Sequence, residues 1–193
     1  MRRLKDFFKD LEPHKAQNIM ELVVPLGEMI RYESGTTLED NQLRNGRIMF
    51  LEKGLARLFH YNEKGEEITA WLIAEANFIS YLDLPNRSTF SHYSLGFLED
   101  SVVYSMSWEK MLELAESNPT VGKHLLGVSL QYVLFWQQRA FLLQFHTAEE
   151  RYDWLMETQP DLFLRAPLQY IASYLNMRPA TLSRLRSGSM KKS

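Results

Sequence analysis

Residues 121–145 limit the folds available to this chain more than any other segment. They include no proline, and 15 of the 25 are apolar or aromatic, which predicts a helix of about seven turns. Two apolar seams run along this helix. The first seam comprises Val121, Leu125, Val128, Tyr132, Phe135 and Leu142, and the second comprises Leu126, Leu130, Val133 and Ala140. A helix that is apolar on two sides has to be covered on two sides.

A single small domain can cover only one side of this helix. The second cover is most simply the same helix of another subunit, so we expect a homodimer whose interface is the first seam. A central helix between two domains of a monomer is the alternative.

The segment before this helix has the pattern of short strands and turns. β-branched and aromatic residues are grouped in short runs, and glycines stand in the turns between them. Strands this short and evenly spaced favour an antiparallel barrel or sandwich. We expect strands at 29–32, 47–51, 55–61, 68–73 and 101–106, with helices before them and at 108–116.

Charge is divided unevenly along the chain. The whole sequence carries 22 basic and 24 acidic side chains, whereas residues 162–193 carry six basic side chains and no acidic one. A short positive segment on an otherwise acidic protein can bind a polyanion at one end of the molecule, and nucleic acid is the obvious candidate. On charge alone, a solvated tail is the alternative.

Several function classes lack their sequence requirements. The chain has no cysteine, which excludes disulfides, thiolate zinc sites and cysteine nucleophiles. Its five histidines form no local metal-binding pair, and no phosphate-binding or nucleophile motif occurs, so we expect neither a metal site nor an enzyme. No apolar run has the length of a membrane span, and the N-terminus lacks a signal peptide's apolar core. We therefore expect a cytoplasmic protein without membrane contact.

The C-terminal segment predicts a helix-turn-helix. Thr147 and Glu150 have the spacing of a capping box, which starts a new helix, and residues 162–164 are expected to be short and extended. Residues 167–187 divide into two short helices that meet at Asn176, with a proline at the first position of each. One helix turns Leu168, Ile171, Ala172 and Leu175 inward, and the other turns Leu182 and Leu185 inward.

The second of these short helices would present its outer face to a DNA groove. Helical periodicity places Ala180, Ser183, Arg184 and Ser187 outward. Of these, Arg184 has the side chain that contacts guanine in a bidentate manner. Ordinary helix packing is the alternative. The predicted DNA-binding residues, including those suited to phosphate contacts, are Tyr170, Arg178, Ala180, Thr181, Ser183, Arg184, Arg186 and Lys191.

The sequence resembles the Crp/Fnr transcriptional regulators. The resemblance is carried by NEKGEE at 62–67, AEERY at 148–152, PLQYIASYL at 167–175 and TLSR at 181–184. It implies an α+β fold in which a cyclic-nucleotide-binding-like β-barrel (jelly roll) is followed by a dimerisation helix and a small helix-turn-helix domain. The implied bounds are 1–119, 120–146 and 147–193. The resemblance also implies that Arg184 reads bases.

The resemblance implies an effector site that is altered here. Members that bind cyclic AMP use a Gly-Glu pair for the ribose and an Arg-Ser pair for the phosphate. Ser80 and Tyr81 stand at the first pair, while Arg87 and Ser88 match the second after a shortened loop. The lost glutamate removes the ribose acceptor, so cyclic nucleotide is a weak candidate and no cofactor is certain. Arg87 as a plain surface arginine is the alternative.

Together these features predict a homodimeric, sequence-specific DNA-binding regulator. Its expected partners are double-stranded DNA, a second copy of the chain and a small-molecule effector. The alternative is a cyclic-nucleotide-binding-like module that binds a ligand or a protein without specific DNA binding.

Overall fold

The eight strands form two antiparallel sheets. The computed structural model describes residue 4 and residues 12–43, 46–80 and 93–189. Sheet A has the strand order β1-β8-β3-β6, and sheet B has the order β2-β7-β4-β5. The strands are β1 Gly27–Tyr32, β2 Thr37–Leu38, β3 Arg47–Lys53, β4 Ala56–Tyr61, β5 Glu67–Ile73, β6 Phe78–Ser80, β7 Ser94–Phe97 and β8 Ser101–Ser107.

Turn chemistry explains how these strands are joined. Gly54 and Gly65 have φ values of +105° and +76°, a region that favours glycine. A Cβ atom at Gly54 would lie 2.2 Å from Ser101 Oγ, so the β3–β4 turn also has no room for a side chain at this position. The predicted antiparallel α+β fold is confirmed. The described strands form two separate sheets, and they do not close into one barrel.

The central strand β3 of sheet A is buried on both faces. Met49 and Leu51 of β3 belong to the core between the two sheets, whereas Ile48 and Phe50 belong to a second core on the outer face. Side chains alternate along a strand, so a run that is apolar throughout is buried on both sides. The outer face is covered by α2 Pro13–Val23, the 3-10 turn η1 Val24–Leu26 and α4 Trp108–Ser117. A short helix, α3 Asp40–Leu43, lies between β2 and β3.

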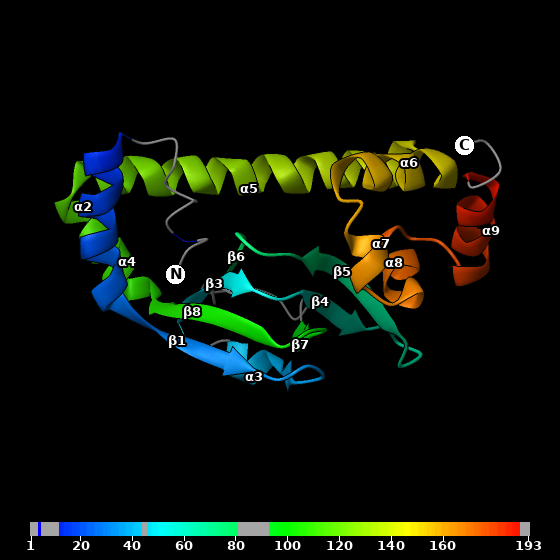
Figure 1. The fold of residues 1–193 in the computed structure, drawn as a ribbon, viewed down its shortest axis with the longest axis horizontal. Coiled ribbons are helices and arrows are strands. Elements are labelled where there is room, and N and C mark those ends of the chain that lie inside the picture. The colour runs from blue at the N-terminus through cyan, green and yellow to red at the C-terminus, as the bar shows by residue number, and fades with distance from the viewer. Residues whose placement is uncertain (1–3, 5–11, 44–45, 81–92, 190–193) are drawn as a thin grey trace.

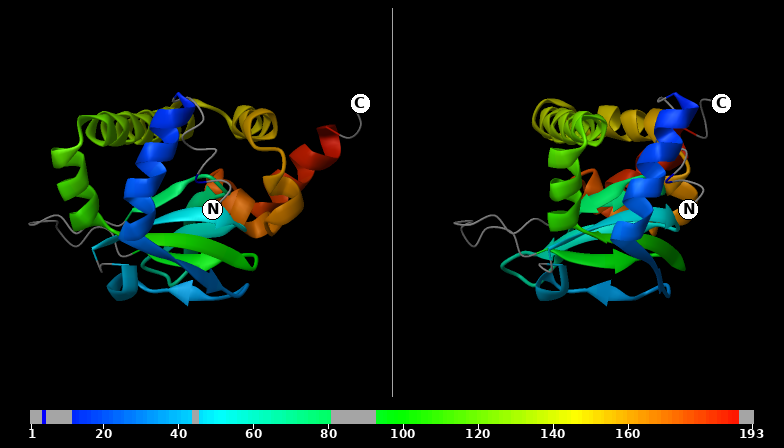
Figure 2. Two further views of the ribbon diagram at one scale, coloured as in Figure 1. Left: turned by 60° about the vertical axis from the view of Figure 1, so that its left-hand side comes forward. Right: turned by 90° about the vertical axis from the view of Figure 1, so that its left-hand side faces the viewer.

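The long helix predicted from the apolar seams is α5, Pro119–Phe145. It begins where Asn118 accepts hydrogen bonds from the N–H groups of Thr120 and Val121 through its side chain. Figure 1 shows α5 spanning the length of the molecule above the sheets, and both views of Figure 2 show it as a separate layer. Among the described helices, none combines the length and the apolar character that a membrane span requires.

Four helices follow α5: α6 Ala148–Thr158, α7 Leu162–Arg165, α8 Leu168–Tyr174 and α9 Pro179–Ser189. The capping box is confirmed, since Glu150 N–H donates to Thr147 Oγ1 and Thr147 N–H donates to Glu150 Oε2. The expectation of an extended segment at 162–164 is wrong. These residues belong to the helical turn α7, because that conformation buries the side chains of both Leu162 and Phe163.

The C-terminal helices share one hydrophobic core with the sheets. Trp71 of β5 and Leu155 of α6 are buried in the same cluster as Ile171 of α8 and Leu182 of α9. Figure 1 shows α7 and α8 filling the space between the end of α5 and β5. The helix-turn-helix is therefore packed directly against the chain's own sheet B.

Candidate nucleic-acid interface

The helix-turn-helix is formed by α8, a tight turn and α9. Asn176 in the turn has a φ of +50°, which Asn tolerates better than most residues. The inward side chains expected from the periodicity are buried: Ile171, Ala172, Leu175 and Leu182 are each at most 1% exposed. Leu168 and Leu185 are partly buried beside them. The two short helices thus cross through a small, fully packed contact.

The opposite face of α9 is open to solvent. Ala180, Ser183, Arg184 and Ser187 are exposed on this face, and Thr181 at its edge is half-buried, while Arg186 is exposed beside Leu182. Arg178, just before the first turn of α9, is also exposed. Lys191 lies outside the described residues. Ala180, Ser183 and Arg184, three of the predicted DNA-binding residues, thus share the open face of α9.

This surface lies at one end of the molecule. In Figure 1, α9 stands at the C-terminal end of α5 and runs across the direction of α5. From Leu162 to Ser189 no side chain is acidic, whereas α6, which packs against α9, carries Glu149, Glu150, Asp153 and Glu157. Such an arrangement can present Arg184 to the edges of base pairs while neighbouring side chains contact phosphates.

Tyr170, the remaining predicted DNA contact, lies on the inner side of α8. Its ring is half-buried and covers the guanidinium of Arg57, whose carbon is 3.7 Å from the ring centroid. Arg57 is 4% exposed, pairs with Glu67 and also lies 4.0 Å from the Phe59 ring. A cation between two aromatic rings is stabilised by both. Tyr170 therefore joins α8 to sheet B.

Arg165 makes four hydrogen bonds that link α7 to the segments after β5 and β7. Its guanidinium donates to both oxygens of Glu75, at 2.8 and 2.9 Å, and to both oxygens of Glu99, at 2.7 and 2.8 Å. Burial raises the pKa of Glu75, but hydrogen bonds from Arg165 and from backbone N–H groups, including that of Gly54, leave it below the ordinary value. Glu75 is thus held as a carboxylate.

Two further contacts complete this domain interface. Arg139 of α5, 6% exposed, donates to the carbonyl oxygen of Tyr174 at 2.6 Å and lies over its ring. The N–H of Thr69 donates to Ser173 Oγ at 2.9 Å. We use "domain interface" for Arg57, Arg139 and Arg165 with their partners Glu67, Glu75, Glu99, Tyr170 and Tyr174.

The contacts of the domain interface are not predictable from local sequence patterns. Arg139 gave the one usable signal, because it interrupts an apolar seam and a charge there requires a polar partner. Arg165 was counted among the basic residues of the C-terminal segment, although its charge is used within the fold.

The structure places the first seam of α5 against the chain's own sheets. Tyr132 OH donates to the carbonyl of Phe78, Phe135 lies 5.2 Å from Trp71 between ring centroids, and Leu142 is buried. The other side of α5 is uncovered. Its apolar side chains are 54–65% exposed and comprise Leu126, Leu130, Val133, Leu134, Phe141 and Phe145, a set that we call the outer seam.

The predicted effector residues are mostly beyond what the structure describes. Ser80 is the last residue of β6 and pairs with Ile48 of β3. Tyr81, Arg87 and Ser88 lie outside the described residues. Within the described part of the chain, no three His, Asp or Glu side chains are grouped as metal ligands.

Several solved structures share this fold. FixK2 from Bradyrhizobium japonicum has a TM-score of 0.72 and 16% identity over 86% of this chain and 85% of its own. The c-di-GMP-responsive global regulator CLP from Xanthomonas campestris has a TM-score of 0.65 and 14% identity over 91% of this chain and 92% of its own. A third structure, from Eubacterium rectale, is assigned to the Crp/Fnr transcriptional regulators. It has a TM-score of 0.62 and 13% identity, covering 95% of this chain and 86% of its own.

The likeness is confined to structure. No protein-family model matches the sequence, and no curated protein matches it. The structural likeness nevertheless covers at least 85% of each chain. Two antiparallel sheets, a long helix and a terminal helix-turn-helix give this chain the fold of the Crp/Fnr transcriptional regulators.

Proposed function

We propose that this protein is a homodimeric, sequence-specific DNA-binding transcription regulator that acts in the cytoplasm. The observation that carries the proposal is Arg184, exposed on the open face of α9 in a terminal helix-turn-helix. The side chain has the donor geometry that reads guanine in the major groove. The likeness of the whole fold to the Crp/Fnr regulators supports the same assignment.

The outer seam of α5 supports the homodimer. Six large apolar side chains lie along one side of a 27-residue helix and have no cover within the described chain. A second α5 packed along this seam would bury them, and a two-fold axis running along α5 would bring both α9 helices to the same end of the dimer (Figure 1). Two such helices fit half-sites about one DNA turn apart, so we expect a near-palindromic operator.

The competing candidate is a ligand-binding or protein-interaction module without specific DNA binding. It would use the same helices for protein contacts, and the domain interface shows that α7 and α8 already contact a protein surface, the chain's own sheet B. The two candidates differ in whether any duplex sequence is preferred.

Selection of bound fragments from randomised duplexes tests the proposal. We expect a near-palindromic motif, and Arg184→Ala should weaken binding to it by about 1–3 kcal/mol per half-site with little effect on unrelated duplexes. Arg31→Ala is the matched control, because Arg31 is exposed on β1 and is not part of the α9 surface. The absence of any enriched sequence would favour the competing candidate.

A further inference from the structure

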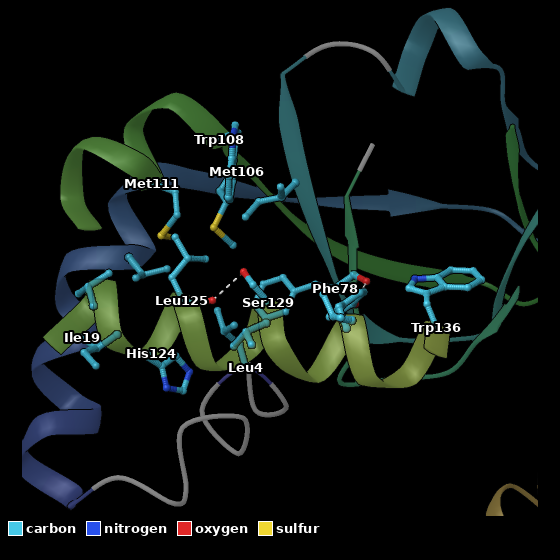
Figure 3. Close-up of a pocket in the computed structure, with 16 residues that line it drawn as sticks. Leu4, Ile19, Phe78, Met106, Trp108, Met111, His124, Leu125, Ser129 and Trp136 are labelled. Atoms are coloured by element: carbon cyan, nitrogen blue, oxygen red, sulfur yellow. Dashed lines mark hydrogen bonds between the residues drawn. The ribbon is translucent and has the colours of Figure 1, made fainter. Parts of the chain in front are cut away.

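A cavity opens between the long helix and the outer face of sheet A. Its volume is about 570 Å³, and its walls come from α2, α4, α5 and the strands β3, β6 and β8 (Figure 3). Ligand sites commonly have volumes of roughly 300–1,000 Å³. The cavity is therefore large enough for a small organic molecule.

The cavity is separate from the space between the two sheets. Ile48, Phe78 and Met106 line it from the outer face of sheet A, whereas Ile79, the next residue after Phe78, is buried in the core between the sheets. Phe50 and Tyr104, at most 1% exposed, pack the layer beside it. A ligand here would lie against α2 and α4, on the other side of sheet A from that core.

The lining offers apolar contact and no charge. None of the 16 lining residues is Asp, Glu, Lys or Arg. Two of the three polar ones use their hydroxyl hydrogens within the protein: Ser129 Oγ donates to the Leu125 carbonyl, and Tyr132 OH donates to the Phe78 carbonyl. The third is His124, which is half-buried, and burial lowers its pKa. Because this pKa lies below the ordinary value of 6.5, the neutral form of the His124 ring predominates at pH 7.

We infer that this cavity binds an uncharged, predominantly apolar small molecule. An ionised ligand would lose its hydration and find no opposite charge in the lining, which is costly. An apolar ligand would instead exchange water contacts for those of side chains such as Ile19, Met111 and Leu125. The inference does not depend on DNA binding.

The cavity contains its own fluorescent reporters, Trp108 and Trp136. The first test is a titration of the whole protein with N-phenyl-1-naphthylamine, an uncharged aromatic probe that is more fluorescent in apolar surroundings. We expect saturable binding of one probe per protomer, with energy transfer from tryptophan. 1-Decanol should displace the probe at a concentration at least tenfold lower than decanoate, which adds a charge to a chain of the same length.

Variants that fill the cavity locate the bound probe. Val128→Phe and Ser129→Phe each add a ring to the lining, and we expect each to raise the probe's Kd at least tenfold. Ser129 is exposed, so its substitution leaves the packed layer beneath intact and keeps the test valid if Val128→Phe fails to fold. Ser117→Phe adds the same ring to an exposed serine of α4 outside the cavity and away from the outer seam, and it should leave the Kd unchanged.

Three results would overturn the inference: no saturable binding, binding that neither filling variant weakens, or equal displacement by decanol and decanoate. The second result would place the probe on the outer seam. All of these measurements are made without DNA. A failure of the ligand inference can therefore be told apart from a failure of the proposed DNA-binding function.

Discussion

Arg165 joins two carboxylates that are far from it in the sequence. Glu75 and Glu99 are separated from it by 90 and 66 residues, and the three side chains are 20–33% exposed. Replacing Arg165 by Met would leave two partly buried carboxylates facing each other without a counter-charge. We expect the variant to lose about 2 kcal/mol of unfolding free energy, measured by urea denaturation.

The control for this substitution is Arg31→Met, which removes one exposed arginine from β1. Its effect should stay within about 0.5 kcal/mol, as is usual for surface positions. If Arg165→Met and Arg31→Met were equally stable, the four hydrogen bonds of Arg165 would contribute nothing to the fold.

The same contact predicts a pH dependence. The pKa of Glu75 is lower in the folded protein than its ordinary value of 4.5, so its ionisation stabilises the fold above that value. This stabilisation is lost as the pH falls through the folded pKa. Between about pH 5 and pH 3, the wild type should therefore lose more unfolding free energy than Arg165→Met. Parallel stability curves for the two proteins would contradict this assignment.

The sequence predicted residues well where local periodicity decides their environment. Ile171, Ala172 and Leu182 were assigned inward from helical spacing and are buried. The contact of Arg165 with Glu75 and Glu99 was not predictable, because nothing local to Arg165 specifies which distant carboxylate it meets. Tyr170 was predicted to contact phosphate. Its contact with Arg57 could not be predicted either, because Arg57 lies on a strand that is distant in the sequence.

At the scale of elements, α5 shows what an apolar pattern leaves open. Both seams were visible in the sequence, yet periodicity does not say which seam meets the chain's own sheets. Arg139 interrupts the first seam between Phe135 and Leu142, and its guanidinium donates to the carbonyl of Tyr174 from α8 and lies over the Tyr174 ring. The first seam is therefore used within the protomer, and the outer seam is the side of α5 that remains for a second copy.

Leu130→Glu tests this assignment of the outer seam. Leu130 is 54% exposed in the protomer, so the substitution should leave the protomer folded. In a symmetric dimer the variant would bury two like charges, and we expect dimerisation to weaken at least about 100-fold, or roughly 3 kcal/mol. Sedimentation at micromolar concentration should show a dimeric wild type and a monomeric variant.

Leu112→Glu is the matched control, because Leu112 is an exposed apolar residue of α4, away from the outer seam. This variant should remain dimeric. A monomeric wild type, or a dimer that Leu130→Glu does not disturb, would remove the outer seam as the interface.

At the scale of the whole molecule, charge and shape favour contact with a polyanion at one end. Residues 1–161 carry 16 basic and 24 acidic side chains, whereas the segment that forms α7–α9 carries no acidic one. Figure 1 places α9 at the end of the long axis, beyond the sheets. Arg178 and Arg184 are exposed at this end, so electrostatic attraction favours contact of a duplex with the α9 surface.

This arrangement predicts how salt affects DNA binding. Each phosphate contact contributes about −0.9 to the slope of log K against log salt concentration, and two-fold symmetry counts each contact twice. Arg178→Gln should therefore make the slope shallower by about 2 and weaken all duplexes equally, whereas Arg184→Ala should act mainly on the preferred sequence. Fluorescence anisotropy at several salt concentrations measures both. An unchanged slope in Arg178→Gln would exclude Arg178 from the phosphate contacts, and a salt-independent affinity would exclude the α9 surface as the DNA interface.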